Sequence, residues 1–187
     1  MIICVTGKIG TGKSTVSKIL SGILKAEIID VDKVGHEVLK MEEVKEKIRE
    51  AFGEDIFLGK EVDRKKLGKI VFNDERLLKK LEEIMHPIMR EIIEKEVKNA
   101  KNYIIIDCAL LRRMKLDHLC DLTITTTADM KTARKRKASI DEATFRKIWD
   151  MQEDVINQGI TINTKKEIRE LEEEVKNILR NRGGINC

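Results

Sequence analysis

An eight-residue segment near the start of the chain combines residue types that hold phosphate groups. Residues 7–14 read Gly-Lys-Ile-Gly-Thr-Gly-Lys-Ser and match the pattern G-x-x-x-x-G-K-[ST] at every fixed position. The glycines let the backbone curl, so that several N–H groups can point at one anion. An apolar segment precedes the loop and a helix-forming segment follows it, which a P-loop requires and a chance glycine-rich turn lacks. The motif therefore predicts a site for ATP, or another nucleoside triphosphate, with Mg²⁺.

Individual residues of this loop have predicted roles in holding the nucleotide. Lys13 is predicted to reach the β- and γ-phosphates, where its charge would aid catalysis, and the hydroxyl of Ser14 to bind Mg²⁺. The N-terminus of the following helix adds a favourable partial positive charge. The residues predicted to bind ATP are Gly7, Lys8, Ile9, Gly10, Thr11, Gly12, Lys13, Ser14 and Thr15.

Acidic residues stand where two predicted strands end. Residues 28–32 read Ile-Ile-Asp-Val-Asp, and strand alternation predicts that Asp30 and Asp32 share one face at the carboxyl end, where ligands bind. One of them could orient or deprotonate an attacking hydroxyl, although Asp32 could instead cap a helix. Residues 104–107 end in Asp107, an arrangement that holds Mg²⁺ directly or through water. A helix cap is the alternative role for Asp107.

A basic run follows the fourth predicted strand. Residues 134–137 read Arg-Lys-Arg-Lys, which could clamp phosphates in a lid or form a solvated helix face, and their position favours the lid. A GTPase is disfavoured, because residues 163–166 are the nearest string to its base-reading Asn-Lys-x-Asp and lack the acid. Small P-loop proteins with a helical insertion and an arginine-rich lid are mostly small-molecule kinases, which is an analogy between folds.

Short β-branched segments alternate with charged helical stretches along the chain. The predicted strands are residues 1–5, 26–31, 103–107, 121–127 and 159–162, and the clearest helix is 165–179. Strands separated by helices pair in parallel. The predicted fold is therefore α/β, a three-layer P-loop NTPase fold whose five-stranded parallel sheet carries a helical insertion and a lid.

The whole chain, residues 1–187, is predicted to be a single P-loop kinase domain. Residues 33–102 are too long for a simple crossover, hold several helical stretches and a loop at 53–64, and are predicted to form a substrate-binding insertion over the carboxyl edge of the sheet. Residues 128–150 form the predicted lid region.

Composition excludes several classes of protein. The 37 basic and 33 acidic residues leave a net charge of only +4, which argues against a strongly basic nucleic-acid binder. No apolar run approaches the length of a transmembrane helix, and no secretory segment opens the chain. We expect a cytoplasmic protein with a small-molecule substrate, no nucleic-acid or membrane partner, and a monomeric state by default. Its cysteines, at positions 4, 108, 120 and 187, lack metal-ligand spacing and are predicted to be reduced thiols.

The ordered set of motifs resembles the dephospho-CoA kinase family over nearly the whole chain. The resemblance rests on residues 5–16, 29–32, 52–53, 62–67, 71–72, 81–87 and 120–121, with Arg136, Gln152 and Asn163. It implies ATP-dependent phosphorylation of the ribose 3′-hydroxyl of dephospho-CoA, with ATP and Mg²⁺ as cofactors. The P-loop alone is shared by many families, whereas the ordered set is far more specific.

The resemblance also implies roles for individual residues. Asp32 would act on the 3′-hydroxyl, and Arg64 would bind the acceptor or steady the transferred group. His86 would line the acceptor side, or it could be a packed residue beside a helix kink at Pro87. On the nucleotide side, Arg136 would reach the ATP phosphates as the lid arginine. Asn163 would lie near the adenine.

Several departures from the family's pattern, among them a blurred Ala-Asp motif at the last strand, leave alternatives open. Lys8 stands in the P-loop and His36 follows Gly35 at positions where the family usually has other residues, an arginine in the case of His36. Residues 109–113 replace an acid of the family with a base, and one of two lid arginines is out of place. The alternatives are a P-loop kinase for another nucleoside or nucleotide acceptor, and a nucleotide-binding regulator without kinase activity.

Overall fold

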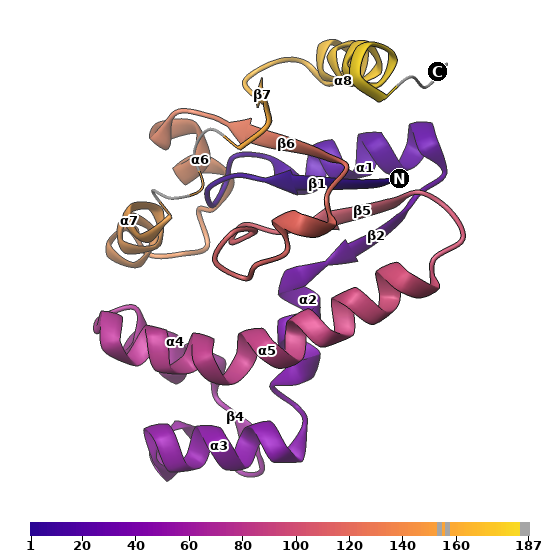
Figure 1. Cartoon of the computed structure of the whole chain (residues 1–187). Coiled ribbons are helices and arrows are strands. Elements are labelled where there is room, and N and C mark those ends of the chain that lie inside the picture. Colours follow the sequence, from indigo (N-terminus) through magenta and orange to yellow (C-terminus); the bar gives the residue numbers. More distant parts are fainter. Residues whose placement is uncertain (153–154, 156–157, 184–187) are drawn as a thin grey trace. The chain divides into compact units, whose positions relative to one another are not determined.

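The computed structural model describes residues 1–152, 155 and 158–183 of the chain. The main chain forms two compact units. The first consists of Met1–Asp30 together with the chain from Glu96 onward, and the second consists of Val31–Lys95. Figure 1 shows the helices and strands of each unit.

A five-stranded sheet forms the centre of the first unit. Its strands run in the order β2-β5-β1-β6-β7, and every neighbouring pair is parallel (Figure 1). The strands are β1 (Ile2–Thr6), β2 (Glu27–Asp30), β5 (Ile104–Asp107), β6 (Leu122–Thr127) and β7 (Ile160–Asn163). The whole of β5 is buried, as expected for a parallel strand covered on both faces. The predicted α/β fold with five parallel strands is confirmed, and each strand overlaps its predicted range.

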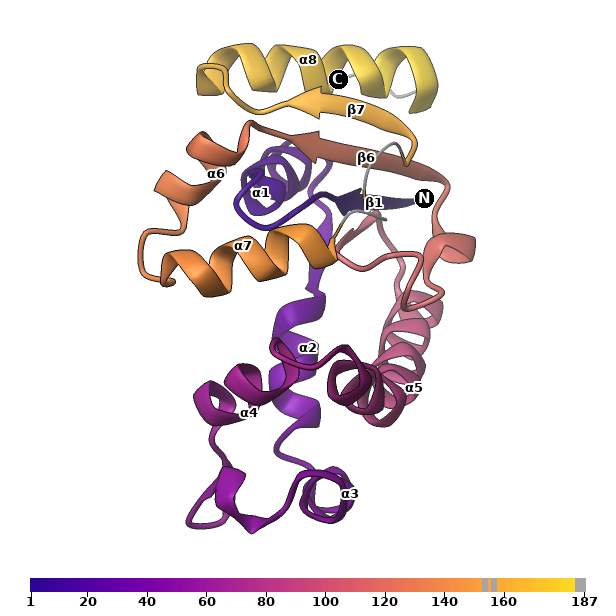
Figure 2. The same cartoon turned by 90° about the vertical axis from the view of Figure 1, so that its left-hand side faces the viewer.

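Helices cover this sheet and fix the P-loop to it. They are α1 (Lys13–Leu24), η2 (Asp117–Leu119), α6 (Met130–Arg136), α7 (Glu142–Met151) and α8 (Ile168–Gly183). Side chains of α1 and α8 share one apolar core with β1, and Figure 2 shows α8 running beside β7. Leu20, Val175 and Leu179 are fully buried there, and each such burial stabilises the fold by about 1.5–3 kcal/mol. The P-loop therefore joins two elements, β1 and α1, that are anchored in the same core.

The second unit is helical and has its own core. It contains α2 (Val31–Val38), α3 (Glu42–Phe52), α4 (Arg64–Val71) and the start of α5 (Glu75–Asn99). Its buried apolar side chains include Val38, Val44, Ile48, Leu67, Val71, Met85, Met89 and Ile93. Helices account for most of this unit, as the sequence predicts for 33–102.

The predicted loop at 53–64 contains more structure than expected. It holds a short 3₁₀ helix, η1 (Glu54–Ile56), and an antiparallel hairpin of β3 (Phe57–Leu58) and β4 (Glu61–Val62). Gly59 lies in the left-handed region at φ 64°, which suits the tight turn between two strands. Strands this short carry no periodic pattern, so the sequence could not reveal them.

The prediction that Asp30 and Asp32 share one face of a strand is wrong. β2 ends at Asp30, whose register partner Asp107 is also the last residue of β5. Beyond this pair β5 offers no further backbone partner, and the chain turns directly into α2 at Val31. Asp32 therefore lies in the first turn of a helix.

The prediction of reduced thiols is wrong for two cysteines. Cys4 of β1 forms a disulfide with Cys120, which stands just before β6. The two residues are 116 positions apart in sequence and meet because β1 and β6 are neighbouring parallel strands. Cys108 keeps a buried thiol that contacts Met114 Sδ at 3.9 Å, and Cys187 lies outside the described residues. Among the described residues, no helix combines the length and apolar character needed to span a membrane.

Candidate active site

The main chain of the P-loop packs directly against the main chain of helix α6. Gly10 (φ 75°) and Gly12 (φ 91°) adopt left-handed conformations that strain any residue with a side chain. A Cβ atom on Gly10 would lie 2.5 Å from the carbonyl oxygen of Ala133 in α6. Glycine at position 10 is therefore required both for the turn of the loop and for the approach of the lid.

The side chain of Lys13 folds back across the loop. Its Nζ atom donates hydrogen bonds to the carbonyl oxygens of Gly7 at 3.1 Å and Lys8 at 3.4 Å. Thr11 Oγ1 donates to the same Lys8 carbonyl at 2.7 Å and lies 2.8 Å from Thr126 Oγ1 of β6. The loop is thus closed on itself and tied to the sheet, with the ammonium group held beside its main chain.

Polar groups from two elements, α1 and β2, act on Asp107 at the carboxyl edge of the sheet. Ser17 Oγ of α1 donates to Asp107 Oδ2 at 3.2 Å. Burial raises the pKa of Asp107 above its ordinary value, whereas the Lys13 charge and hydrogen bonds from Ser14 and Ser17 oppose that rise. The negative charge of Asp30 on β2 adds to the rise in the pKa of Asp107. Lys13, Ser14 and Asp30 therefore all act on Asp107, and together the four residues form one cluster.

This cluster fits Mg²⁺ by the chemistry of its donors. Ser14 offers a hydroxyl oxygen, and Asp107 and Asp30 offer carboxylate oxygens, the hard ligands that Mg²⁺ prefers. Within the described part of the chain, no group of three or more His, Cys, Asp or Glu residues could hold a metal ion by itself. Mg²⁺ in kinases usually needs only one or two carboxylates, because substrate phosphates and water complete its coordination.

Arg136 at the end of α6 joins three segments. Its Nη1 donates to Thr164 Oγ1 at 2.8 Å and to the Gly10 carbonyl at 3.4 Å, and its Nη2 donates to the Thr164 carbonyl at 2.8 Å. The guanidinium group therefore links α6 to the P-loop and to the segment after β7. Its role as a lid arginine stays a prediction.

The N-terminus of α6 is capped by an acid. Asp129 accepts hydrogen bonds from the backbone N–H of Thr132 at 2.8 Å and from its hydroxyl at 2.9 Å. These bonds, together with Lys165, lower the pKa of Asp129 to about 2. Elsewhere in the basic run, Arg134 stacks over the Phe145 ring at 5.7 Å, and the neighbouring lysines are exposed. The run is therefore partly a solvated face, and Arg136 is the member that contacts the loop.

Sequence reasoning missed two side chains that hold the P-loop in place. Thr164 is buried, and its Oγ1 donates to the Thr11 carbonyl at 2.7 Å while accepting from Arg136. Gln152 Oε1 accepts from the backbone N–H of Ile9 at 2.7 Å. The family resemblance includes Gln152 without giving it a role, and Thr164 stands two residues after the predicted strand 159–162 with no pattern to mark it.

Asn163 ends β7 beside this network. Its Oδ1 accepts a hydrogen bond from the backbone N–H of Lys165 at 2.9 Å, which forms a local turn. Its side chain is exposed next to the buried Thr164. The side chain of Asn163 is therefore open to solvent, next to the residue that Arg136 joins to the P-loop.

The second unit carries a separate pocket of about 350 Å³. Its lining residues are His36, Glu37, Leu39, Lys40, Glu61, Val62 and Arg64. Arg64, the first residue of α4, therefore shares a pocket with His36 of α2, a residue that sequence reasoning noted only as a departure. Neither Asp32 nor His86 is among the lining residues. His86 lies within α5, which continues through Pro87.

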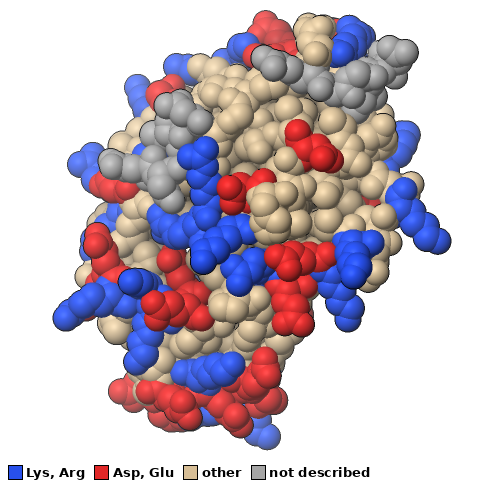
Figure 3. Space-filling view, in the orientation of Figure 1, with Lys and Arg blue, Asp and Glu red and all other residues tan. Residues whose placement is uncertain are grey.

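Charges of both signs are spread over the face of the molecule shown in Figure 3. Lys and Arg gather there in some places and Asp and Glu in others, and uncharged residues cover much of the rest. Positive charge at the P-loop is therefore a local feature carried by a few side chains, above all Lys13 and Arg136.

The sequence is similar to known proteins over nearly its whole length. The sequence model of the dephospho-CoA kinase family matches residues 1–181. A dephospho-CoA kinase of Borreliella burgdorferi is 40% identical over 171 residues, which cover 88% of this chain and 82% of that relative.

Solved structures agree at the level of the fold. A protein from Thermus thermophilus superposes with a TM-score of 0.78 at 23% identity, covering 96% of both chains. Dephospho-CoA kinase from Campylobacter jejuni superposes with a TM-score of 0.65 at 21% identity, covering 98% of both chains.

Proposed function

Because the chain belongs to the dephospho-CoA kinase family, we propose that the residues gathered at its P-loop carry out that family's reaction. The reaction transfers the γ-phosphoryl group of ATP to the ribose 3′-hydroxyl of dephospho-CoA and gives coenzyme A. The observation that carries the proposed residue roles is the cluster of Lys13, Ser14 and Asp107 at the carboxyl edge of the sheet. Such a cluster suits phosphoryl transfer, whose catalysis depends on positioning and charge stabilisation.

The nucleotide end of the site is built from residues 7–15. Their backbone N–H groups and the N-terminus of α1 bind the phosphates, and Lys13 stabilises negative charge on the transferred group. Ser14 and Asp107 hold Mg²⁺, with Asp30 in reach of the same cluster. Bound Mg²⁺ neutralises charge on the phosphates and orients them for attack.

The acceptor end depends on carboxylates at the junction of β2 and α2. Asp32 orients the 3′-hydroxyl or takes its proton, two residues after the Asp30 that belongs to the metal-binding cluster. Arg64 binds the acceptor, and its pocket with His36 supports this role because dephospho-CoA carries a pyrophosphate. His86 contributes to the acceptor side from α5.

The lid and the insertion have separate predicted roles. Residues 128–150 form the lid of a single kinase domain, and residues 33–102 form the substrate-binding insertion, a role that the compactness of Val31–Lys95 supports. Arg136 steadies the ATP phosphates from the lid, and Asn163 lies near the adenine. Exclusion of water by the lid limits hydrolysis of ATP without transfer. A cytoplasmic location and a monomeric state stay predictions from the sequence.

One departure from the family pattern has a structural explanation. Arg113, in the segment where the family has an acid, donates a hydrogen bond from Nη2 to the Met151 carbonyl at the end of α7 at 2.6 Å. The base at this position thus serves contacts within the first unit, so it need not signal a changed acceptor.

The proposed function is tested by supplying ATP with dephospho-CoA, AMP or adenosine as separate acceptors and weighing the products. We expect dephospho-CoA alone to gain one phosphoryl group. Asp32→Asn should lower kcat far more than it weakens ATP binding, because Asp32 acts on the acceptor. Equal losses in kcat and ATP affinity would contradict the role of Asp32. Preferential transfer to AMP or adenosine would contradict the assignment of dephospho-CoA as the acceptor.

A further inference from the structure

Lys8 is part of the P-loop through its main chain and part of the lid through its side chain. Its carbonyl oxygen accepts from Thr11 Oγ1 at 2.7 Å and from Lys13 Nζ at 3.4 Å. Its side chain leaves the loop, is only 9% exposed, and places Nζ 5.0 Å from the centroid of the Trp149 ring in α7. That distance lies within the range of an effective cation–π interaction, and tryptophan is the best aromatic partner for a cation.

Further contacts hold the same end of α7 in place. The residue after Lys8 donates its backbone N–H to Gln152 Oε1 at 2.7 Å. Arg113 donates to the Met151 carbonyl at 2.6 Å. Within α7 itself, the ring of Phe145 lies 5.8 Å from that of Trp149. One side of α7 thus faces the loop.

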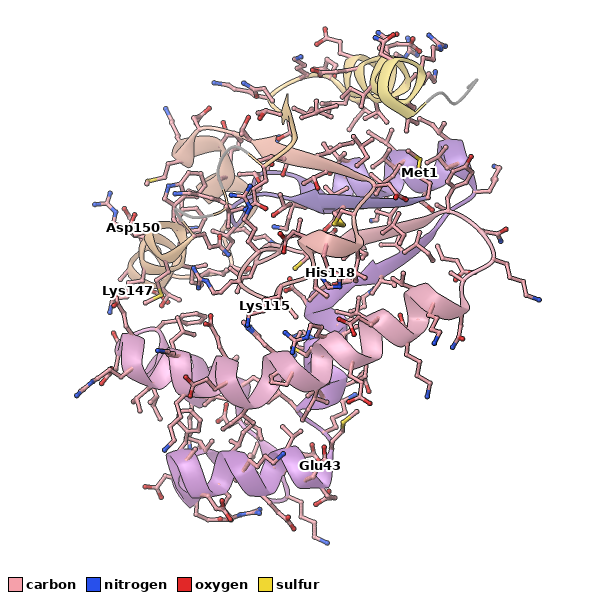
Figure 4. The ribbon with its side chains drawn as sticks, viewed as in Figure 1. Met1, Glu43, Lys115, His118, Lys147 and Asp150 are labelled. Atoms are coloured by element: carbon pink, nitrogen blue, oxygen red, sulfur yellow. A yellow bond between two sulfur atoms is a disulfide. The ribbon has the colours of Figure 1, made fainter. Side chains whose placement is uncertain are left out.

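The opposite side of α7 faces solvent. Lys147 and Asp150, both labelled in Figure 4, are exposed on this helix. A lysine on α7 that stands away from the loop provides a matched control for the buried lysine of the loop.

We propose that Lys8 is a positioning residue whose cation–π contact with Trp149 docks α7 on the P-loop and thereby sets the affinity for ATP. The inference rests on the proposed function, since it assigns ATP to this loop. Ordering the loop before ATP arrives lowers the cost of binding, and a smaller docked population would raise the apparent dissociation constant in proportion. Lys8 acts through α7, so its loss should affect ATP affinity more than the rate of transfer.

The chain contains one tryptophan, so Trp149 reports on this contact directly. Lys8→Met should raise KM for ATP by about 3- to 30-fold, the range expected for loss of a desolvated cation–π contact. Its effects on kcat and on KM for dephospho-CoA should stay within about 2-fold. Without acceptor, Trp149 emission should change and quenching by acrylamide should increase. Lys8→Arg, which keeps the cation, should restore both properties, and Lys147→Met should leave them as in the wild type.

A double-mutant cycle separates positioning from direct action on the phosphates. With Trp149→Phe, the additional effect of Lys8→Met on KM for ATP should shrink, because the weaker aromatic partner already loosens the contact. An unchanged KM and emission in Lys8→Met would overturn the proposal. A loss of kcat with unchanged emission would also overturn it, because Lys8 would then act on the reacting groups. Trp149 emission and ATP binding are measured without acceptor. Both measurements therefore test the proposal even if dephospho-CoA is not the substrate.

Discussion

Asp30 and Asp107 are register partners at the carboxyl ends of the neighbouring parallel strands β2 and β5. The charge of Asp30 is one of the causes that raise the pKa of Asp107, so the two carboxylates interact. Ser14, Ser17 and Lys13 oppose that rise from α1. A cation held by this cluster would relieve the repulsion between the two acids, which is the electrostatic reason to assign Mg²⁺ here.

Asp107→Asn should therefore weaken the binding of Mg²⁺. Loss of a carboxylate ligand should lower kcat by about 100-fold or more and raise the Mg²⁺ concentration needed for half-maximal activity. Asp30→Asn should act in the same direction with a smaller effect. Titrating activity against Mg²⁺ at saturating ATP measures both, with the exposed Asp117→Asn as control. A Mg²⁺ dependence unchanged in Asp107→Asn would contradict the assignment.

The central parts of this site were predictable because their signals are local or periodic. The P-loop depends on fixed spacing, and Asp107 follows an apolar strand that is buried on both faces. Asp32 was placed on a strand because strand alternation continues in sequence, whereas the backbone pairing of β2 stops at Asp30. The disulfide of Cys4 and Cys120 depends on strand order, which no residue pattern encodes.

Thr164→Val should loosen the P-loop. The hydroxyl of Thr164 donates to the Thr11 carbonyl and accepts from Arg136, and valine keeps the shape but offers neither bond. Leaving these buried partners unsatisfied should cost about 1–3 kcal/mol of unfolding free energy and raise KM for ATP. Thr164→Ser, which keeps the hydroxyl, should lose less. Urea unfolding and ATP titration of both variants check this prediction. If Thr164→Val and Thr164→Ser lose the same stability and ATP affinity, the effect comes from packing and not from the hydroxyl.

Reduction of the disulfide should lower the thermal stability of the protein. The bond between Cys4 and Cys120 closes a loop with a sequence separation of 116 residues, and such a constraint disfavours the unfolded chain. We expect Tm to fall by about 10 °C on reduction. Cys120→Ser should start at the lower Tm and not respond to reductant.

A count of reactive thiols checks that the disulfide is present. Unreduced protein, denatured and alkylated, should gain two labels by mass, although the chain has four cysteines. Four labels without reductant would show that the bond had not formed in the sample.

Arg64→Met and His36→Ala should weaken binding of the acceptor and leave binding of ATP unchanged. Both side chains line the same pocket of the second unit, whereas the ATP-binding residues lie in the first. Loss of a charge-assisted contact should raise KM for dephospho-CoA by about 10-fold or more in Arg64→Met. Steady-state kinetics with each substrate varied in turn checks this, with the exposed Lys47→Met of α3 as control. A rise in KM for ATP of the same size would contradict a role confined to the acceptor.

Asp129→Asn should change how stability responds to acid. In the folded protein the pKa of Asp129 is about 2, lowered first by the backbone N–H of Thr132, then by its hydroxyl and by Lys165. Since this folded-state pKa lies below the unfolded value of 3.8, the charge contributes stability that is fully present above about pH 4. That contribution is lost as pH falls through about 2, where the carboxyl is protonated in the folded state as well.

Asparagine can still accept the backbone N–H of Thr132 and cap α6, but it cannot ionise, so the variant removes the charge of Asp129 and the contacts of its second oxygen while it keeps the main cap bond. Unfolding free energies measured in urea at steps from pH 5 to pH 2 should fall more steeply for the wild type than for Asp129→Asn. The two curves should approach each other toward pH 2, because the carboxyl of Asp129 becomes protonated in the wild type as well. Asp55→Asn, at an exposed position of η1, serves as the matched control. Parallel curves for the wild type and Asp129→Asn would show that the cap of the lid helix draws no stability from this charge.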